Sequence, residues 1–216
     1  MVKCPSHWYN SLRRRMGRSA LLLAACLVGT PAMAIDEPDH NIIERAGSFE
    51  LRDYRGYVVA ETYVDGEFEK VGSEGFRRLF SYISGSNRSA QKITMTAPVE
   101  QQAAGTKIAM TAPVEQQRAG SRWRIAFVLP ASFTLASAPK PTDARVELAA
   151  VAPRRMAVVR YRGTWSKDHY DEELAALLRF IGERGLTALG EPIFARYDPP
   201  LMPWFMRRNE IQIPVN

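Results

Sequence analysis

Residues 49–84 read FELRDYRGYVVAETYVDGEFEKVGSEGFRRLFSYIS, and they decide the fold. Apolar and polar side chains alternate over residues 49–54, which is the two-residue period of a half-buried strand. Residues 57–64 (YVVAETYV) predict a second strand, with a turn at Arg55-Gly56 between the two. From Glu67 to Ser84 the apolar side chains recur at helical spacing instead, and Asp65 is placed to cap that helix. The stretch therefore predicts two strands followed by a helix.

The second half of the chain repeats this plan. Residues 145–151 and 155–161 are predicted as two further strands, and Ser166 can cap a helix over residues 167–183. Strands are also expected after each helix, at residues 122–129, 191–197 and 209–215. Because the order strand–strand–helix–strands recurs, we predict an α+β domain. Its architecture is a distorted antiparallel β-barrel or curved sheet with two flanking helices, built from two pseudo-symmetric halves.

Two glycines, Gly72 and Gly75, interrupt the first helix, and each costs roughly 1 kcal/mol relative to alanine. We expect them where a strand packs tightly against the helix; close approach of a flat ligand is the alternative. Phe80 falls on the apolar stripe of this helix, and Phe76 lies at its border. The helix is therefore a candidate wall for a ligand groove.

A tandem repeat separates this helix from the next strand. KITMTAPVEQQAAG at residues 92–105 returns as KIAMTAPVEQQRAG at residues 107–120. Each copy alternates like a half-buried strand, and Pro98 and Pro113 indicate a strand end or a sheet edge. The Gln-Gln runs that follow read as connections. Since repeats usually mark architecture, we interpret residues 92–121 as a duplicated hairpin arm that packs on the sheet.

Residues 1–34 have the features of a cleaved signal peptide. A basic region up to Arg18 precedes a short apolar run at residues 19–28, and Ala32-Met33-Ala34 is a small-x-small cleavage site. We therefore expect a periplasmic or secreted protein. Its parts are the signal peptide (1–34), a polar N-terminal arm (35–48) and a single domain (49–216).

The cysteines allow one alternative to this location. Both of them, Cys4 and Cys26, lie within the leader. Residues 23–26 read LAAC and resemble a bacterial lipobox, which would anchor the protein to a membrane through a lipid on Cys26. Without that anchor the mature domain has no disulfide and no thiolate, and its length suffices for one compact core.

Composition excludes several classes of function. Of 29 basic and 23 acidic residues, five basic and no acidic residues lie before Ile35, so cleavage lowers the net charge from +6 to +1. A nearly neutral domain gives no electrostatic reason to expect a nucleic-acid partner. The sequence also lacks the zinc-protease, nucleophile-elbow, phosphate-loop and Cys-x-x-Cys motifs. We therefore expect a monomeric binding protein rather than an enzyme.

Five motifs resemble the SOUL haem-binding protein family. They are KIAMTAPV (107–114), FVLP (127–130), AVVRYRG (157–163), ARYDPP (195–200) and RRNEI (207–211), in the family's order. The resemblance covers residues 49–215. It implies a distorted β-barrel flanked by two helices and reversible binding of haem or a related porphyrin in an apolar groove. The implied fold also resembles the effector domains of drug-sensing regulators.

One position departs from the family pattern. Members with a proposed haem-ligating His carry it where Asp53 stands here, so the resemblance implies binding without a strong axial His. His169 is the remaining candidate metal ligand, although its place among acids at a helix start also suits an exposed residue. His40 is expected to be solvated in the polar arm.

The candidate groove residues supply apolar contact or a positive charge for the propionates. They are Phe76, Phe80, Met95, Met110, Tyr170, Trp204, Arg77 and Arg207. Two rival hypotheses remain. One is an envelope structural or stress protein whose groove is filled by its own aromatic side chains, and the other is a binder of another amphipathic or cationic small molecule.

Overall fold

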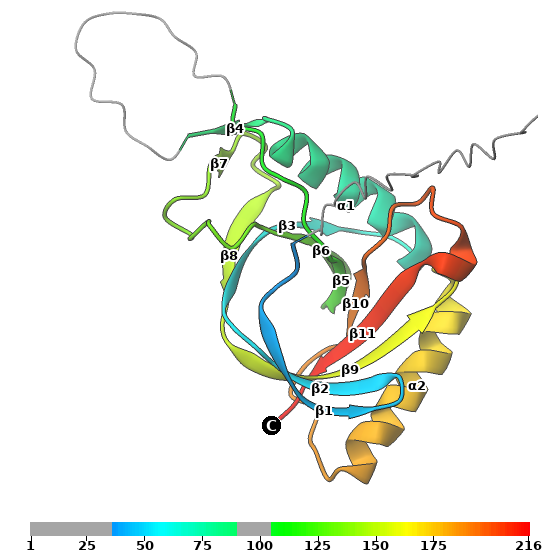
Figure 1. The fold of residues 1–216 in the computed structure, drawn as a ribbon. Helices are drawn as coiled ribbons and strands as arrows, with labels where there is room; N and C mark the ends of the chain where they lie inside the picture. The colour runs from blue at the N-terminus through cyan, green and yellow to red at the C-terminus, as the bar shows by residue number, and fades with distance from the viewer. Residues whose placement is uncertain (1–35, 90–104) are drawn as a thin grey trace, which may run out of the picture. The chain divides into compact units, whose positions relative to one another are not determined.

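A computed structural model describes residues 36–89 and 105–216, and within them nine strands form one curled antiparallel sheet (Figure 1). Their order across the sheet is β1-β2-β9-β11-β10-β5-β6-β3-β8. The strands are β1 (His40–Ala46), β2 (Phe49–Tyr54), β3 (Tyr57–Val64), β5 (Val114–Ala119), β6 (Arg122–Val128), β8 (Glu147–Val151), β9 (Arg154–Arg162), β10 (Ile193–Arg196) and β11 (Arg208–Pro214).

Two helices and a few short elements complete this part of the chain. The helices are α1 (Phe68–Ile83) and α2 (Lys167–Glu183), and a one-turn 3-10 helix, η1, covers Trp204–Met206. A separate small sheet pairs β4 (Asn87–Arg88) with β7 (Lys140–Pro141). The predicted α+β class, with a curved sheet and two helices, is confirmed. No helix in the described ranges is both long enough and apolar enough to cross a membrane.

The strand order contains an internal two-fold pattern. β3, β6 and β5 neighbour one another in one half, β9, β11 and β10 do so in the other, and β5 pairs with β10 at the centre. Each half also receives an outer strand from the other: β2 pairs with β9, and β8 pairs with β3. The predicted repetition of strand–strand–helix–strands is therefore visible in the sheet.

Both helices cover the outer face of the curl, where the two main apolar clusters lie (Figure 1). The cluster under α2 includes Leu177, Ile181, Val159, Ile211 and Ile213. The cluster under α1 includes Val71, Leu79, Val58, Ile125 and Phe127. Burying one such side chain contributes about 1.5–3 kcal/mol, so these clusters are the main source of stability. Trp123 packs against both of them.

The α1 glycines mark close contacts. A Cβ on Gly75 would lie 2.5 Å from Cγ1 of Ile125, so the helix can approach the sheet only because this side chain is absent. A Cβ on Gly72 would lie 2.5 Å from Nη2 of Arg196. The prediction of tight packing at these positions is confirmed, although Gly72 makes room for a guanidinium rather than for a strand.

The strand of the second repeat copy is displaced from its predicted position. We expected the alternating residues 107–114 to form a strand and the Gln-Gln run to form a connection, but the strand begins at Val114 and contains the Gln-Gln run. Pro113 lacks the N–H that a ladder needs, which explains a strand that starts directly after it. Gln116 is satisfied inside the fold because its Nε2 donates to the carbonyl of Phe68 at 2.8 Å. The first copy, at residues 92–104, lies outside the described residues.

Of the two predicted helix caps, the one at Asp65 is wrong and the one at Ser166 is confirmed in position. Asp65 is not the cap of α1, since Glu67 holds that position without a side-chain capping bond. Ser166 occupies the N-cap of α2, but its hydroxyl lies 2.9 Å from Oγ1 of Thr164 and makes no capping bond.

The segment expected as a polar N-terminal arm contains the edge strand β1. This strand pairs with β2, and its register shifts between Ile42 and Glu44, which is a β-bulge. Ile42 and Ile43 at the bulge are both exposed. The alternation in this segment is interrupted by the bulge, and the strand was therefore not recognised from its sequence.

Candidate ligand-binding site

We define the outward side of α1 as the surface that Phe76 and Phe80 present to solvent, and it lies at the edge of the core cluster under this helix. The rings of Phe76 and Phe80 are nearly parallel, with centroids 5.8 Å apart and planes 12° apart. Phe76 is half-buried and packs edge-on against Phe127 at 5.2 Å, whereas Phe80 keeps 48% of its surface exposed. An i, i+4 spacing on a helix places the two rings on one face. The pair therefore presents a flat apolar surface, supported from below by the core.

Arg77 lies beside this pair. It is exposed, its Nε donates to the carbonyl of Ser73 at 3.4 Å, and it has no carboxylate partner among the described residues. It also lines a hollow of about 330 Å³ together with Glu74, Arg78, Ser81, Asp143 and Arg145. In that hollow Arg145 is paired with Asp143 at 2.7 Å and Arg78 with Glu74. Arg77 is therefore the cation of this hollow that is free to meet an anionic ligand.

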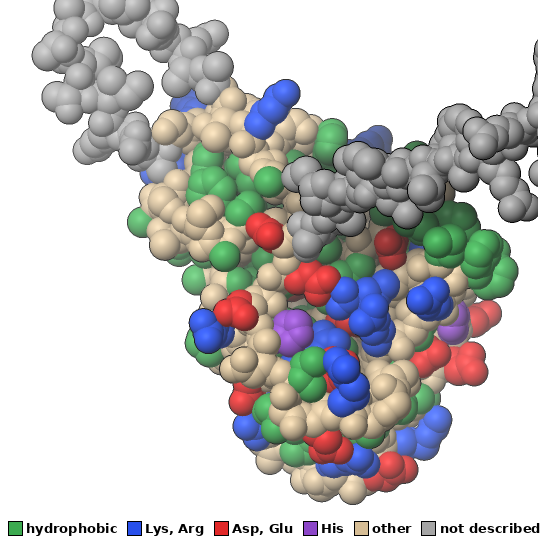
Figure 2. Space-filling view, viewed as in Figure 1, with side chains coloured by type: hydrophobic (Ala, Val, Ile, Leu, Met, Phe, Trp, Pro, Cys, Tyr) green, Lys and Arg blue, Asp and Glu red, His purple; other side chains and the backbone are tan. Residues whose placement is uncertain are grey.

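A second apolar surface is the loop between β10 and β11. Its exposed side chains include Leu201, Trp204, Phe205 and Met206, with Leu201 96% exposed. The space-filling view shows hydrophobic side chains gathered with arginines beside them (Figure 2). Arg207 does not point its charge to a ligand here. Its guanidinium donates to the carbonyls of Met202 and Pro200 at 2.8 and 2.7 Å and lies 4.4 Å from the ring of Trp165, so it fixes the loop.

The remaining groove candidates are scattered. Tyr170 is buried in the α2 cluster, where its ring packs 4.9 Å from Phe68, and we find it in the core rather than at a groove. Met110 is 45% exposed in the segment leading to β5. That segment lies beside the end of α1, because the N–H of Ile108 donates to the carbonyl of Ile83 at 2.8 Å. Met95 lies outside the described residues.

The histidines occupy packed positions. His169 stands edge-on to Tyr161 at 5.0 Å, with Nε2 3.7 Å from Oε1 of Glu173. His40 is half-buried rather than solvated: its ring packs on Tyr54 at 4.8 Å, and Nδ1 lies 3.0 Å from the carbonyl of Pro38. Within the described ranges there is no cluster of three His, Cys, Asp or Glu side chains that could hold a metal ion.

The position of the family's proposed axial His is tied to a neighbouring strand. Asp53 on β2 pairs with Arg155 on β9, with Nε 3.0 Å from Oδ1, and both side chains are largely exposed. This carboxylate stabilises the strand pair at the surface. It has no contact with the aromatic pair on α1 among the interactions of the described residues.

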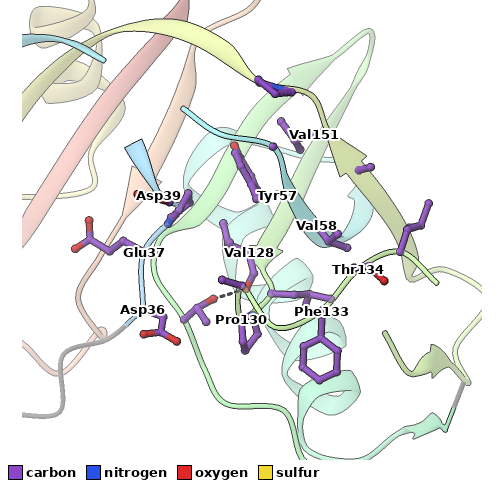
Figure 3. Close-up of a pocket in the computed structure, with 18 of the residues that line it drawn as sticks. Asp36, Glu37, Asp39, Tyr57, Val58, Val128, Pro130, Phe133, Thr134 and Val151 are labelled. Atoms are coloured by element: carbon purple, nitrogen blue, oxygen red, sulfur yellow. Dashed lines mark hydrogen bonds between the residues drawn. The ribbon is translucent and has the colours of Figure 1, made fainter. Parts of the chain in front are cut away.

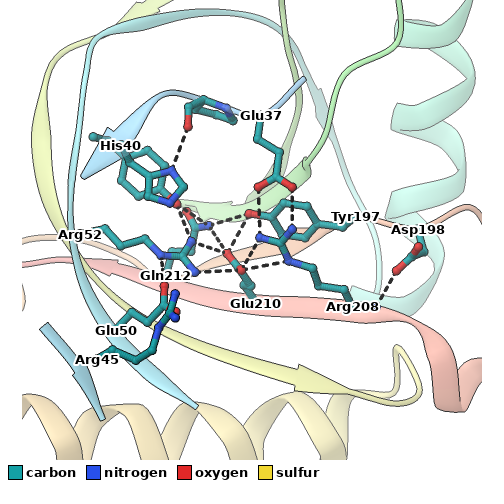
Figure 4. A network of polar contacts seen from close by, with 12 residues as sticks. Glu37, His40, Arg45, Glu50, Arg52, Tyr197, Asp198, Arg208, Glu210 and Gln212 are labelled. Carbon is teal, nitrogen blue, oxygen red and sulfur yellow. Dashed lines mark hydrogen bonds and ion pairs between the residues drawn. The ribbon is translucent and has the colours of Figure 1, made fainter. Parts of the chain in front are cut away.

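The inner face of the curl is charged and buried, which sequence reasoning missed. Arg52 on β2 forms two hydrogen bonds with Glu210 on β11, at 2.9 and 3.1 Å, and its Nε binds Glu50 at 2.6 Å (Figure 4). Arg208 joins Glu210 to Glu37, at 2.8 and 2.6 Å. The alternation of Glu50 with Arg52, and of Arg208 with Glu210, is the signal that could have revealed two charged faces on predicted strands.

The network sets the charge states of its members. Burial alone would raise the pKa of Glu210, but hydrogen bonds and charge from Arg52, together with Arg208, lower it to about 2. Burial raises the pKa of Tyr54 to about 12, so its hydroxyl remains protonated. The inner face is therefore a network of ion pairs, and these residues offer no apolar surface on which a porphyrin ring could pack.

A pocket of about 570 Å³ opens at another part of the sheet (Figure 3). It is bounded by residues 36–39, the start of β3, the segment 128–135 after β6 and the segment 150–153 between β8 and β9. Asp36, Glu37 and Asp39 lie on one side of it. None of the groove residues expected from the sequence lines this pocket.

Solved structures share this curled sheet with two outer helices at very low sequence identity. The C-terminal domain of EcmrR matches with a TM-score of 0.57 and 9% identity, covering 78% of this chain and 96% of that one. A hydrolase from Listeria innocua matches with a TM-score of 0.51 and 11% identity, covering 81% and 94% of the two chains. These likenesses define a class of curled-sheet α+β domains and concern the fold alone.

Sequence comparison narrows this class to one family. The model of the SOUL heme-binding protein family matches residues 35–214, and the chain belongs to that family. It is 27% identical to heme-binding protein 1 of Xenopus laevis over 165 residues, which is 76% of this chain and 82% of that protein. It is 26% identical to heme-binding protein 2 of Homo sapiens over 193 residues, or 83% and 89% of the two chains.

Haem is a flat apolar ring with two anionic propionates, and the three surfaces fit it unequally. The pocket has three carboxylates and no basic residue among its lining residues, so it would repel the propionates. The loop has exposed apolar side chains, but its Arg207 is already engaged. The outward side of α1 combines an aromatic pair with the free charge of Arg77, and it is the surface that fits the group best.

Proposed function

We propose that this protein binds haem or another tetrapyrrole reversibly on the outward side of α1, without a strong axial His. The observation that carries the proposal is membership of the SOUL heme-binding protein family over nearly the whole described chain. The relatives named heme-binding protein support the class of ligand. The contacts of Phe76, Phe80 and Arg77 support α1 as the binding surface.

Stacking on Phe80 and Phe76 would supply the apolar contact. A porphyrin face laid on Phe80 covers a side chain that is now 48% exposed, and burial of apolar surface contributes about 25 cal/mol per Å². Offset stacking of aromatic rings adds about 0.5–1.5 kcal/mol. Met110 is exposed two residues after Ile108, which is hydrogen-bonded to the last residue of α1, and it would be a further apolar contact if the ring extends to that end of the helix.

Arg77 would hold a propionate. Arg77 and Phe80 are three residues apart on a helix, so their side chains are neighbours. A planar guanidinium can bind a carboxylate through two parallel hydrogen bonds, which orients the ring as well as attracting it. Reversible binding follows from this arrangement, because the ring would remain open to solvent on its other face and no histidine is placed to bind the iron.

The leader supports an exported form of this binder. The family match starts at residue 35, directly after the expected cleavage site Ala32-Met33-Ala34. Mass spectrometry of the protein recovered from cells that express the full chain should give an N-terminus at Ile35. A lipid-modified N-terminus at Cys26 would instead support the anchored alternative, and an intact residue 1 would contradict export.

A haemin titration of the full chain, followed by Soret absorbance, tests the binding proposal. We expect a saturable one-to-one shift that is unchanged in His169→Ala and His40→Ala. Phe80→Ala and Arg77→Gln should each weaken binding roughly threefold to tenfold, the effect of losing about 1 kcal/mol of contact. The matched controls are Leu178→Ala and Arg179→Gln, exposed residues of α2 whose loss should leave the affinity unchanged.

Other results would separate the rival hypotheses. Absence of a saturable shift in a folded protein would contradict the proposal and favour a structural or stress role. That role predicted a groove filled by Phe76, Phe80 and Trp204, whereas Phe80 and Trp204 are exposed. A shift that disappears only in His169→Ala would show iron ligation by that residue and would move the site to α2.

A further inference from the structure

The pocket near the N-terminal segment has the size and the walls of a small-molecule site. Its volume of about 570 Å³ lies within the range of about 300–1,000 Å³ typical of ligand pockets. Its apolar lining includes Val58, Val128, Leu129, Pro130, Phe133, Leu135, Val151 and Pro153. Val58, Val128 and Leu129 are buried in the sheet, so this wall is rigid.

The pocket also contains an aromatic ring with a fixed orientation. Tyr57 lines it, and the hydroxyl of this residue donates to Oε1 of Glu115 at 2.9 Å while accepting from Nη2 of Arg154 at 3.2 Å. The hydroxyl is therefore already satisfied by hydrogen bonds within the protein. Tyr57 therefore offers its ring, rather than its polar end, to an occupant.

The charge at the rim has one sign. Asp36, Glu37 and Asp39 lie together on one side, and the lining residues include no Lys, Arg or His (Figure 3). Glu37 is neutralised by Arg208 at 2.6 Å, and Asp39 pairs at 3.1 Å with Arg55, which does not line the pocket. Asp36 has no ion-pair partner among the described residues. A net negative potential at the rim remains.

We propose that this pocket is a second site, separate from the proposed tetrapyrrole surface, and that it binds an amphipathic organic cation. The apolar part of such a molecule would fill the space between Phe133 and Val58. Its positive group would lie at the carboxylate rim, where Asp36 attracts it. The face of Tyr57 adds attraction for a cation within about 6 Å. An anion of the same shape would be repelled.

Two dyes with the same ring system but opposite charge provide the test. Rhodamine 6G is a cationic xanthene and fluorescein is an anionic one, and both report binding to the full chain by fluorescence anisotropy. We expect saturable binding of rhodamine 6G and at least tenfold weaker binding of fluorescein. Asp36→Asn should weaken rhodamine 6G binding roughly threefold to tenfold, the effect of one nearby charge in a solvated rim.

Matched variants locate the site. Ala150→Trp places a large side chain at the edge of the pocket on an exposed position and should abolish dye binding, whereas Ala175→Trp on the exposed face of α2 should not. Asp65→Asn, an exposed carboxylate outside the lining, is the control for the charge change. Equal binding of both dyes, or rhodamine 6G binding that persists in Ala150→Trp, would overturn the proposal.

Haemin added with the dye distinguishes the two sites. If they are separate, haemin does not displace rhodamine 6G, and Ala150→Trp leaves the Soret titration unchanged. If haemin displaces the dye and Ala150→Trp abolishes both, the pocket is the tetrapyrrole site and this inference is wrong. Loss of haemin binding alone would contradict the proposed function and leave the second site standing.

Discussion

Arg52 and Glu210 form a buried ion pair, and their side chains are 2% and 0% exposed. Removing Arg52 would leave the buried carboxylate of Glu210 with Arg208 alone, and breaking a buried pair costs up to about 3–5 kcal/mol. We therefore expect Arg52→Ala to lower the free energy of unfolding by about that amount, measured by urea denaturation.

The control for this change is an ion pair of the same type at the surface. Arg155 and Asp53 are 41% and 47% exposed, and exposed pairs contribute about 0–1 kcal/mol. Arg155→Ala should therefore have little effect. If Arg52→Ala and Arg155→Ala lowered the free energy of unfolding by similar amounts, burial would not make the Arg52 ion pair more important than a surface pair.

The same network of ion pairs makes the free energy of unfolding depend on pH. The pKa of Glu210 is about 2 in the folded chain against an ordinary value of 4.5, so its carboxylate stabilises the fold above pH 4.5. That contribution, about 3 kcal/mol, should be lost as the pH falls from about 4.5 to about 2. Glu210→Gln cannot titrate there. The free energy of unfolding of this variant should therefore fall less than that of the unmodified protein over this pH range. An equally steep fall in both proteins would assign the acid sensitivity to other groups.

At the scale of single elements, the two helices respond differently to the same substitution. Alanine is favoured over glycine in a helix by about 1 kcal/mol. Gly182 of α2 has nothing within 4 Å of an added Cβ, so Gly182→Ala should stabilise the protein by roughly that amount. Gly75→Ala should destabilise it, because the new methyl would lie 2.5 Å from Ile125. Thermal unfolding of both variants gives the comparison.

The opposite signs are the critical result of that comparison. If Gly75→Ala also raised the unfolding temperature, α1 would have room to move away from the sheet. The close packing described for Gly75 would then be without energetic consequence.

The elements that could be predicted from the sequence were those with a clear local pattern, such as strand-forming residues bounded by a turn or apolar residues at helical spacing. The strand over residues 49–54, the strand over residues 57–64 and the helix over residues 167–183 match the structure residue for residue. β1 and β5 were not located correctly, because one contains a bulge and the other carries glutamines whose bonds are made to distant parts of the chain. Local alternation contains no information on either.

The whole described domain should unfold as one unit, since a single sheet carries both core clusters and Trp123 joins them. Leu79→Ala under α1 and Leu177→Ala under α2 should each cost about 2–5 kcal/mol. Tryptophan fluorescence and far-UV circular dichroism should give coincident transitions in both variants. Two separate transitions in either variant would mean that the halves unfold independently.

The same scale explains what the sequence could show of the ligand sites. The surface on α1 could be predicted from three residues of one helix, because helical spacing places both Phe76 and Arg77 next to Phe80. The pocket could not, since residues 36–39, 128–135 and 150–153 meet only after the sheet has formed. Its acidic rim comes from a segment that the sequence presented as a polar arm.

The open curl has one further consequence, for solubility. Among the described strands, β1 and β8 each have a single neighbour, so the sheet ends in two strands that have no partner strand along one side. Such edges can recruit the same edge of another molecule and start aggregation. The bulge between Ile42 and Glu44 breaks the regular hydrogen-bonding row of β1 beside two exposed isoleucines. The bulge therefore protects against self-association at an edge where exposed apolar side chains would otherwise favour pairing with another molecule.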